Sequence, residues 1–175
     1  AWHLVNFLTF QLGIYLFYRF AIKWMGKPSA LFSVALFAWQ PLLWGHAFIN
    51  PKDMPFLVFF IGAICFGFEM VDELAQDESS KYTKALLAAF FLGIATSIRV
   101  LGPLAAILTG VYALGQFRKI RLSELIMRFA VYAFFAILIA FIAWPYLWTN
   151  PLQKFVEVFE FMSDNPTQLT VLFNG

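Results

Sequence analysis

The chain has 175 residues, of which 62% are hydrophobic, 20% aromatic and only 13% charged, and its formal net charge is +2. A soluble domain is usually about 45–50% apolar and about 25% charged, so this composition excludes a soluble enzyme, a disordered segment and a disulfide-rich secreted module. The apolar residues form long blocks instead of alternating, which excludes a transmembrane β-barrel. The scattered basic residues leave no nucleic-acid footprint, and the single cysteine, Cys65, excludes an internal disulfide.

The apolar blocks predict an all-α, polytopic transmembrane helix bundle. Each block is bounded by charge, Gly or Pro, and its length is near that needed to cross a hydrocarbon core of about 30 Å. Several blocks are short, so half-spans are open as an alternative to full spans. The simpler prediction is six spans, at residues 4–21, 30–44, 54–68, 85–98, 100–117 and 125–147.

Basic residues predict the orientation of these spans. Nine Lys and Arg lie at the junctions after odd-numbered spans, and three lie elsewhere. Cytoplasmic loops carry the excess of Lys and Arg, so the richer junctions are expected on the cytoplasmic side. Residues 1–148 then form the transmembrane module, and 149–175 begin an outer loop. Three segments are expected to face outward: 45–53, 99–103 and 148–175.

The first outward segment carries four polar residues: His46, Asn50, Lys52 and Asp53. One interpretation is structural, with Asp53 as the N-cap of the next span. The other is a ligand site at the membrane surface, in which Lys52 neutralises a phosphate. In that site His46 and Asp53 bind a divalent cation or steady the lysine. The residues alone leave both interpretations open.

The second and third outward segments offer an arginine and an amphipathic helix. Arg99 lies between two apolar runs. It is either an interfacial side chain that reaches water or a guanidinium that binds a lipid phosphate with paired hydrogen bonds. After Asn150 and Pro151, which suit the N-cap and first helical positions, apolar residues recur at helical spacing through 152–164. This helix is expected to lie on the outer membrane surface, to end at 165–167, and to be followed by an extended stretch at 171–173.

Three motifs resemble a known enzyme family. They are Gly-His-Ala-Phe-Ile-Asn-Pro-Lys-Asp-Met-Pro-Phe at 45–56, Thr-Ser-Ile-Arg at 96–99 before a Gly-Pro corner, and Trp-Pro-Tyr-Leu-Trp-Thr-Asn-Pro at 144–151 leading to Phe-Met-Ser at 161–163. Together they resemble bacterial family-39 glycosyltransferases. These are membrane enzymes of the GT-C superfamily, related to protein O-mannosyltransferases and lipid A aminoarabinose transferases.

The resemblance implies a function. Such enzymes take a sugar from a polyprenyl- or dolichyl-phosphate donor and pass it, with inversion, to a protein, lipid or glycan acceptor on the outer face of the bacterial plasma membrane. The chain is then expected to be an internal piece, inactive alone, whose main catalytic acid precedes Ala1. Asp53 matches the acidic position of the family's second outer loop, near the donor phosphate, and Lys52 and Asn50 match flanking positions. Arg99 is expected at the phosphate from its charge and topology.

Two other classes of function remain as alternatives. A transporter or flippase-like carrier usually places ionisable residues at mid-membrane, whereas the predicted spans hold almost none away from their ends. Glu69 and Arg128 are expected to be boundary residues at cytoplasmic ends. A non-catalytic membrane scaffold would not need the polar turn at 45–53, but the sequence does not exclude it.

Overall fold

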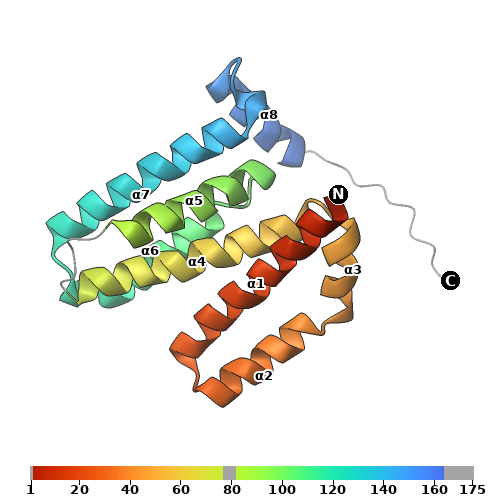
Figure 1. The fold of residues 1–175 in the computed structure, drawn as a ribbon. Helices are drawn as coiled ribbons and strands as arrows, with labels where there is room; N and C mark the ends of the chain where they lie inside the picture. The colour runs from red at the N-terminus through yellow and green to blue at the C-terminus, as the bar shows by residue number, and fades with distance from the viewer. Residues whose placement is uncertain (1, 77–81, 164–175) are drawn as a thin grey trace. The chain divides into compact units, whose positions relative to one another are not determined.

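The computed structural model describes residues 2–76 and 82–163, and within these ranges it consists of helices joined by turns and loops, with no strand (Figure 1). The chain divides into two compact units, Ala1–Ala143 and Trp144–Gly175. The first unit contains α1 (Trp2–Trp24), α2 (Lys27–Ala38), α3 (Pro41–Ile49), α4 (Asp53–Ala75), α5 (Thr83–Ile98), α6 (Leu104–Gln116), the 3-10 turn η1 (Phe117–Lys119) and α7 (Leu122–Ala143). The second contains the 3-10 turn η2 (Pro145–Leu147) and α8 (Pro151–Ser163).

Three helices, α1, α4 and α7, are long and apolar enough to cross a membrane. The pair α2 and α3 meets the same test when taken together, which makes up to four spans among the described residues. Helices α5 and α6 have 16 and 13 residues, or about 24 and 20 Å at 1.5 Å per residue. These lengths support a membrane protein, but the six full spans and their orientation stay predictions.

The predicted second span is broken. A bend of 57° separates α2 from α3, because Pro41 disfavours helical backbone at the residue before it. Gln40 accordingly has an extended ψ of 115°. Pro145 acts in the same way on the predicted sixth span, and α7 ends at Ala143 instead of continuing to residue 147.

Helix α4 runs past the predicted end of the third span. The prediction stopped at residue 68 because three acidic residues follow, but the helix continues to Ala75. Those acids are matched by basic residues on neighbouring helices, so the charge does not end the helix. The Glu69 carboxylate accepts two bonds from the Arg19 guanidinium, of 2.6 and 2.7 Å, and lies 2.6 Å from the Lys84 ammonium. Asp72 pairs with Lys23.

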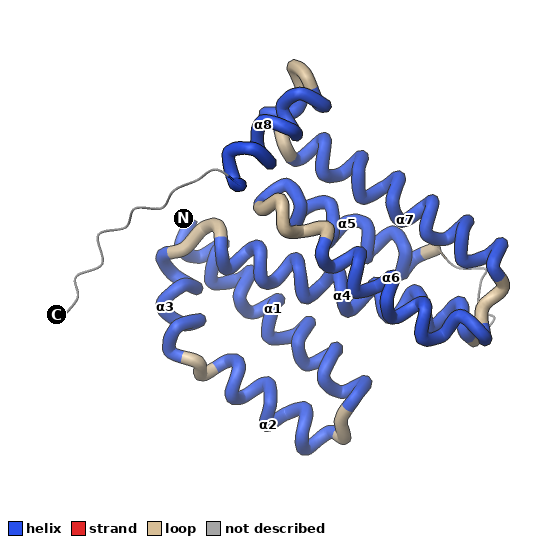
Figure 2. The backbone as a smooth tube through the Cα atoms, turned by 180° about the vertical axis from the view of Figure 1, so that it is seen from behind, coloured by secondary structure: helices blue, strands red, loops and turns tan. Residues whose placement is uncertain are grey.

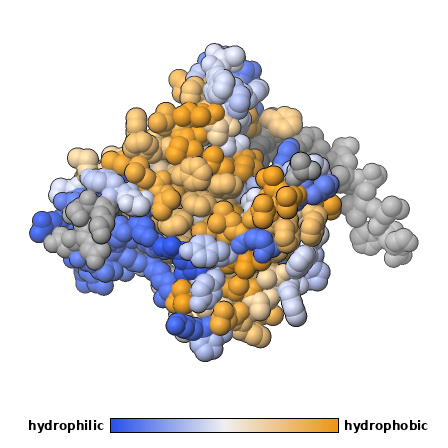
Figure 3. All heavy atoms as spheres, in the orientation of Figure 1, coloured by the Kyte–Doolittle hydropathy of each residue, from blue (hydrophilic) through white to orange (hydrophobic). Residues whose placement is uncertain are grey.

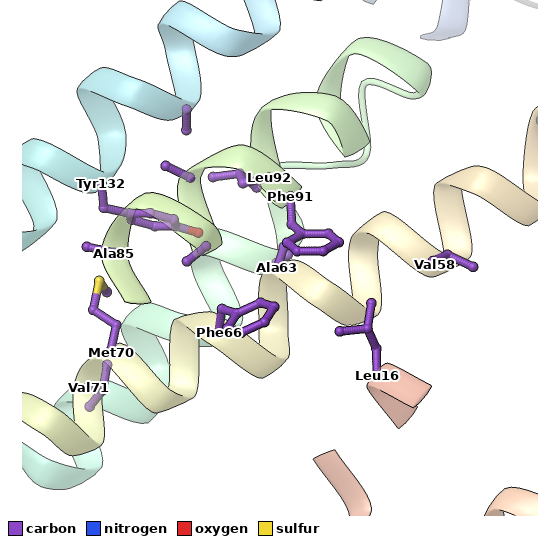
Figure 4. Packing of buried hydrophobic residues seen from close by; sticks show 14 of the residues in the cluster. Leu16, Val58, Ala63, Phe66, Met70, Val71, Ala85, Phe91, Leu92 and Tyr132 are labelled. Atoms are coloured by element: carbon purple, nitrogen blue, oxygen red, sulfur yellow. The ribbon is translucent and has the colours of Figure 1, made fainter. Parts of the chain in front are cut away.

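The core of the first unit lies around α4 and α5. Helix α4 packs against α1, α5 and α6, and α5 packs on its other side against α7. Buried residues from these helices interdigitate, with Phe66 stacked on Phe91 at a centroid distance of 5.4 Å (Figure 4). Small residues allow the close approach, as is usual between membrane helices. Four such residues of α5, Ala85, Ala88, Ala89 and Gly93, are buried.

Apolar side chains dominate much of the face shown in Figure 3. Many large ones are exposed on the helices that meet the span criteria; for example, Ile137 of α7 is 70% exposed. Hydrophilic residues gather at the left of this view, where α4 ends and α5 begins. An exposed apolar surface of this extent suits contact with lipid tails more than with water.

The contact of α5 with α7 at Gly93 gives a prediction. A Cβ at Gly93 would lie 2.7 Å from Ile139 Cβ and 2.8 Å from the backbone oxygen of Ala136, which cannot rotate away. We expect Gly93→Ala to lower the free energy of unfolding by about 1–3 kcal/mol, measured by thermal unfolding in detergent. Gly110→Ala is the control, because nothing lies within 4 Å of its added carbon, and it should be neutral or stabilising by up to about 1 kcal/mol. Equal melting of the two variants would contradict the packing described here.

Candidate functional site

Two turns lie side by side at one end of the first unit. One joins α3 to α4 and the other joins α5 to α6, and both are seen as tan segments at the same end of the bundle (Figure 2). An ion pair between Arg99 and Asp53 connects them. Around this pair lie the residues that we call the Asp53 cluster: Asn6, His46, Asn50, Asp53 and Arg99.

The Asn50 side chain organises the turn between α3 and α4. Its oxygen accepts the backbone N–H groups of Lys52 and Asp53, at 3.0 and 2.8 Å. Its amide group donates to His46 Nδ1 at 2.8 Å and to Asp53 Oδ2 at 2.7 Å. All four bonds that a carboxamide readily makes are therefore used, and Asn50 draws the two other side chains together.

The predicted capping role of Asp53 is wrong. Helix α4 begins at Asp53 with Lys52 at the N-cap position, and no side-chain cap bond is made from that position. The first backbone N–H groups are instead satisfied by Asn50, three residues before the helix, in the local bonding typical of asparagine in turns. The Asp53 carboxylate is thereby free to face Arg99.

Arg99 is positioned by the corner between α5 and α6. Its backbone oxygen accepts the N–H of Gly102 at 2.9 Å, and a Cβ at Gly102 would lie 2.5 Å from the Thr96 backbone nitrogen, so the corner requires glycine. The guanidinium lies 5.9 Å from the Phe56 ring centroid. With 40% of the Arg99 side chain and 44% of the Asp53 side chain exposed, the pair remains open to a ligand.

Lys52 lies beside the cluster and is exposed. Within the part of the chain that the structure describes, its ammonium makes no ion pair or hydrogen bond, although its backbone is fixed by Asn50. An exposed cation next to one that is held by Asp53 suits an anionic ligand that approaches from outside.

A pocket of about 300 Å³ adjoins the cluster between α3 and α4. His46 and Asp53 supply its polar lining. Apolar side chains of the two helices supply the rest: Leu42, Leu43, Met54 and Leu57. The pocket thus places an apolar wall directly beside charged groups, an arrangement that suits an amphipathic ligand.

The divalent cation predicted at His46 and Asp53 has a limited ligand set. Residues 2–76 and 82–163 contain no group of three or more His, Cys, Asp or Glu that could hold a metal ion. His46 Nδ1 and Asp53 Oδ2 both already accept bonds from Asn50. Ca²⁺ takes six to eight oxygen ligands and Mg²⁺ six, so a cation here would need its ligands from elsewhere. The cation role stays a prediction.

Sequence reasoning missed two residues of α1 at this site. Asn6 is buried, with 4% of its surface exposed, and donates to the backbone oxygens of His46 and Asn50. His3 Nδ1 donates to the Phe48 oxygen at 2.6 Å. The available signal was two polar residues spaced i, i+3 at the start of an apolar helix, which places them on one face.

The third outward segment belongs to the second unit. Helix α8 begins at Pro151, and the oxygen of Asn150 accepts the N–H of Lys154 at 2.9 Å, so the predicted helix start is confirmed. Leu152 is 84% exposed and Val156 52%, as expected for an apolar face that meets lipid. The predicted end at 165–167 and the extended stretch at 171–173 lie outside the described residues.

The polar side of α8 is tied to η2. Glu157 accepts bonds from the Tyr146 hydroxyl at 3.0 Å, from Gln153 Nε2 at 3.1 Å and from the Lys154 ammonium at 2.6 Å. The bond from Lys154 lowers the pKa of Glu157, with a further contribution from Tyr146. The same carboxylate raises the pKa of Lys154.

No protein-family model, curated protein or solved structure matches this chain. The resemblance stated from the motifs therefore remains an interpretation of the residues themselves.

The Arg99–Asp53 pair predicts a measurable coupling. Partly exposed ion pairs contribute about 0.5–1 kcal/mol, so a double-mutant cycle of Asp53→Asn and Arg99→Gln should give a coupling of that size in the free energy of unfolding, smaller at high salt. A cycle of Asp53→Asn with Lys119→Gln, on η1, is the control and should be additive. Coupling of the same size in both cycles would show that the pair does not join the two turns.

The bonds to Glu157 predict its titration. A carboxylate whose pKa is lowered in the folded state stabilises the fold above its unfolded pKa, and this contribution is lost as the pH falls through the folded pKa. In carboxyl-labelled NMR, assigned by Glu157→Gln, the midpoint should lie below the usual range of glutamate. It should rise towards that range in Lys154→Met, and an unchanged midpoint would contradict the contact.

Proposed function

We propose that this chain is part of a membrane glycosyltransferase that takes a sugar from a polyprenyl- or dolichyl-phosphate donor and transfers it, with inversion, at the outer face of a bacterial plasma membrane. The observation that carries the proposal is the Arg99–Asp53 pair beside an apolar-walled pocket. A lipid-linked sugar phosphate needs both features, because its tail stays in hydrocarbon while its charged head reaches water.

Arg99 and Lys52 act on the donor phosphate in this proposal. Departure of the lipid phosphate from the sugar leaves negative charge on its oxygens, and preorganised cations stabilise that charge. Arg99 Nη2 bonds Asp53 Oδ1, and a guanidinium has five N–H donors, so others remain for phosphate. Asp53 orients the guanidinium, and Lys52 adds a mobile point charge.

The acceptor half of the reaction requires a carboxylate base that removes the proton of the attacking hydroxyl or amine. Asp53 is engaged by Arg99 and Asn50, which suits a positioning carboxylate better than a base. The proposal follows the family resemblance in placing the base upstream of Ala1. The acceptor is a protein, lipid or glycan on the outer face.

The distribution of charge favours this proposal over a carrier. The ion pairs of α4 lie near its two ends, and residues 54–68 between them contain no ionisable group other than Cys65. Glu69 and Arg128, expected as boundary residues, lie in the second turn from the end of α4 and the second turn of α7. A transporter would place such residues near the middle of the membrane. A non-catalytic scaffold, in turn, has no need of a half-exposed ion pair at an open pocket.

The test is sugar transfer by the full-length protein in lipid vesicles that contain a polyprenyl-phosphate sugar. Loss of a transition-state charge contact costs about 10²–10³-fold in rate, so we expect Arg99→Ala to lower transfer about 100-fold. Arg99→Lys should retain part of the activity because the charge persists without the fork. Asp53→Asn should lower transfer about tenfold through the loosened guanidinium.

Lys119→Ala is the matched control, since Lys119 is an exposed cation on η1, and it should transfer normally. All variants are compared at equal membrane expression. Normal transfer by both Arg99→Ala and Asp53→Asn would remove these residues from the site. Movement of the lipid-linked sugar across the vesicle without transfer to any acceptor would replace the enzyme proposal with the carrier.

A further inference from the structure

Asn6 is a polar side chain buried in an apolar helix. It is 4% exposed and lies in the second turn of α1. A buried polar group is costly unless its hydrogen bonds are made, more so within a membrane. Its amide group makes two bonds, to the backbone oxygens of His46 at 3.1 Å and of Asn50 at 3.0 Å.

These two oxygens lie at the end of α3. Asn50 is the C-cap residue of α3, and its own N–H bonds the His46 oxygen at 3.0 Å. The last four carbonyl groups of a helix lack partners inside the helix, and Asn6 supplies donors to this end. His3, one turn earlier in α1, donates to the Phe48 oxygen between them. The start of α1 therefore holds three carbonyl groups of one short segment.

We propose that Asn6 is a positioning residue for the other members of the Asp53 cluster. It fixes the backbone of His46 and Asn50, and Asn50 in turn binds Asp53 and, through its oxygen, the backbone of Lys52. Asn6 therefore acts on Asp53 and Lys52 through Asn50. That this positioning governs sugar transfer rests on the proposed function.

Two substitutions separate positioning from general stability. Asn6→Leu keeps the approximate size and removes both donors, so the Asn50 oxygen loses its bond from α1 and the His46 oxygen keeps only the bond from the Asn50 N–H. Asn6→Asp keeps the shape, but an ionised carboxylate only accepts bonds and faces two carbonyl oxygens. When protonated, it donates one bond, so its effect depends on pH. Burial favours the neutral carboxyl, so the introduced aspartate is expected to gain its proton at a higher pH than an exposed one.

The first experiment measures hydrogen exchange of the full-length protein in lipid nanodiscs. We expect Asn6→Leu to speed exchange at least tenfold in peptides that cover residues 46–56, while peptides from α5 and α7 stay unchanged. Thr9→Val is the matched control, because the Thr9 hydroxyl bonds only the Val5 oxygen of its own helix. Unchanged exchange at 46–56, or an equal rise in every helix, would overturn the proposal.

The second experiment measures sugar transfer against pH. Relative to the parent protein, Asn6→Asp should lose about tenfold at roughly pH 8 and recover most of this loss at roughly pH 5, as the introduced carboxyl gains its proton. A constant ratio across this range would overturn the link from Asn6 to transfer. If the parent protein transfers no sugar, the proposed function fails, and the exchange measurement decides the positioning role by itself.

Discussion

Two ion pairs fix the register of α5 against α4. Lys84, in the first turn of α5, pairs with Glu69, and Arg99, just after its last turn, pairs with Asp53. Sixteen positions separate the two acids and fifteen separate the two bases, so the antiparallel helices are matched almost residue for residue. Because a helix that slides along its partner would break both pairs, this match holds the corner that carries Arg99 beside the start of α4.

Helix α4 supplies the acids around which the rest of the first unit assembles. Besides the two pairs with α5 and its corner, its carboxylates bind Arg19 and Lys23 of α1, and Glu73 lies 3.9 Å from the Arg128 guanidinium of α7. Charged side chains inside a membrane are costly unless they are paired, so pairing with an acid of α4 stabilises the position of each base. The same helix begins at Asp53, and the forces that assemble the bundle therefore also place the candidate site.

Composition and apolar run length were enough to predict a membrane helix bundle and the positions of its helices, because both follow from the cost of exposing backbone to lipid. They were not enough for the helix ends. Glu69 was expected at a span boundary and Asp72 in the loop that follows, although Glu69, Asp72 and Glu73 all lie within α4 and pair with bases distant in sequence. Pro41 and Pro145 were visible, and their effect on the second and sixth spans could have been foreseen from the missing N–H and the restricted preceding residue.

The candidate site was predicted in its parts but not in its connections. His46, Asn50, Lys52, Asp53 and Arg99 all lie at one end of the unit, as the charge pattern indicated. The pairing of Arg99 with Asp53 joins residues 46 apart, and nothing local in the sequence encodes it. Asn50 was expected to flank the acid, yet its bonds define the turn. Asn6 was read as part of an apolar span, because a single amide hardly alters the hydropathy of such a run.

The register of α5 has a consequence for the surrounding bilayer. The charged layers at Asp53 and Glu69 are sixteen residues apart, or about 24 Å along the helix, whereas a typical hydrocarbon core is about 30 Å thick. When the apolar length of a protein is shorter than the hydrocarbon core, the bilayer beside the protein becomes thinner. Around α4 and α5 the membrane is therefore expected to be locally thinner than its surroundings.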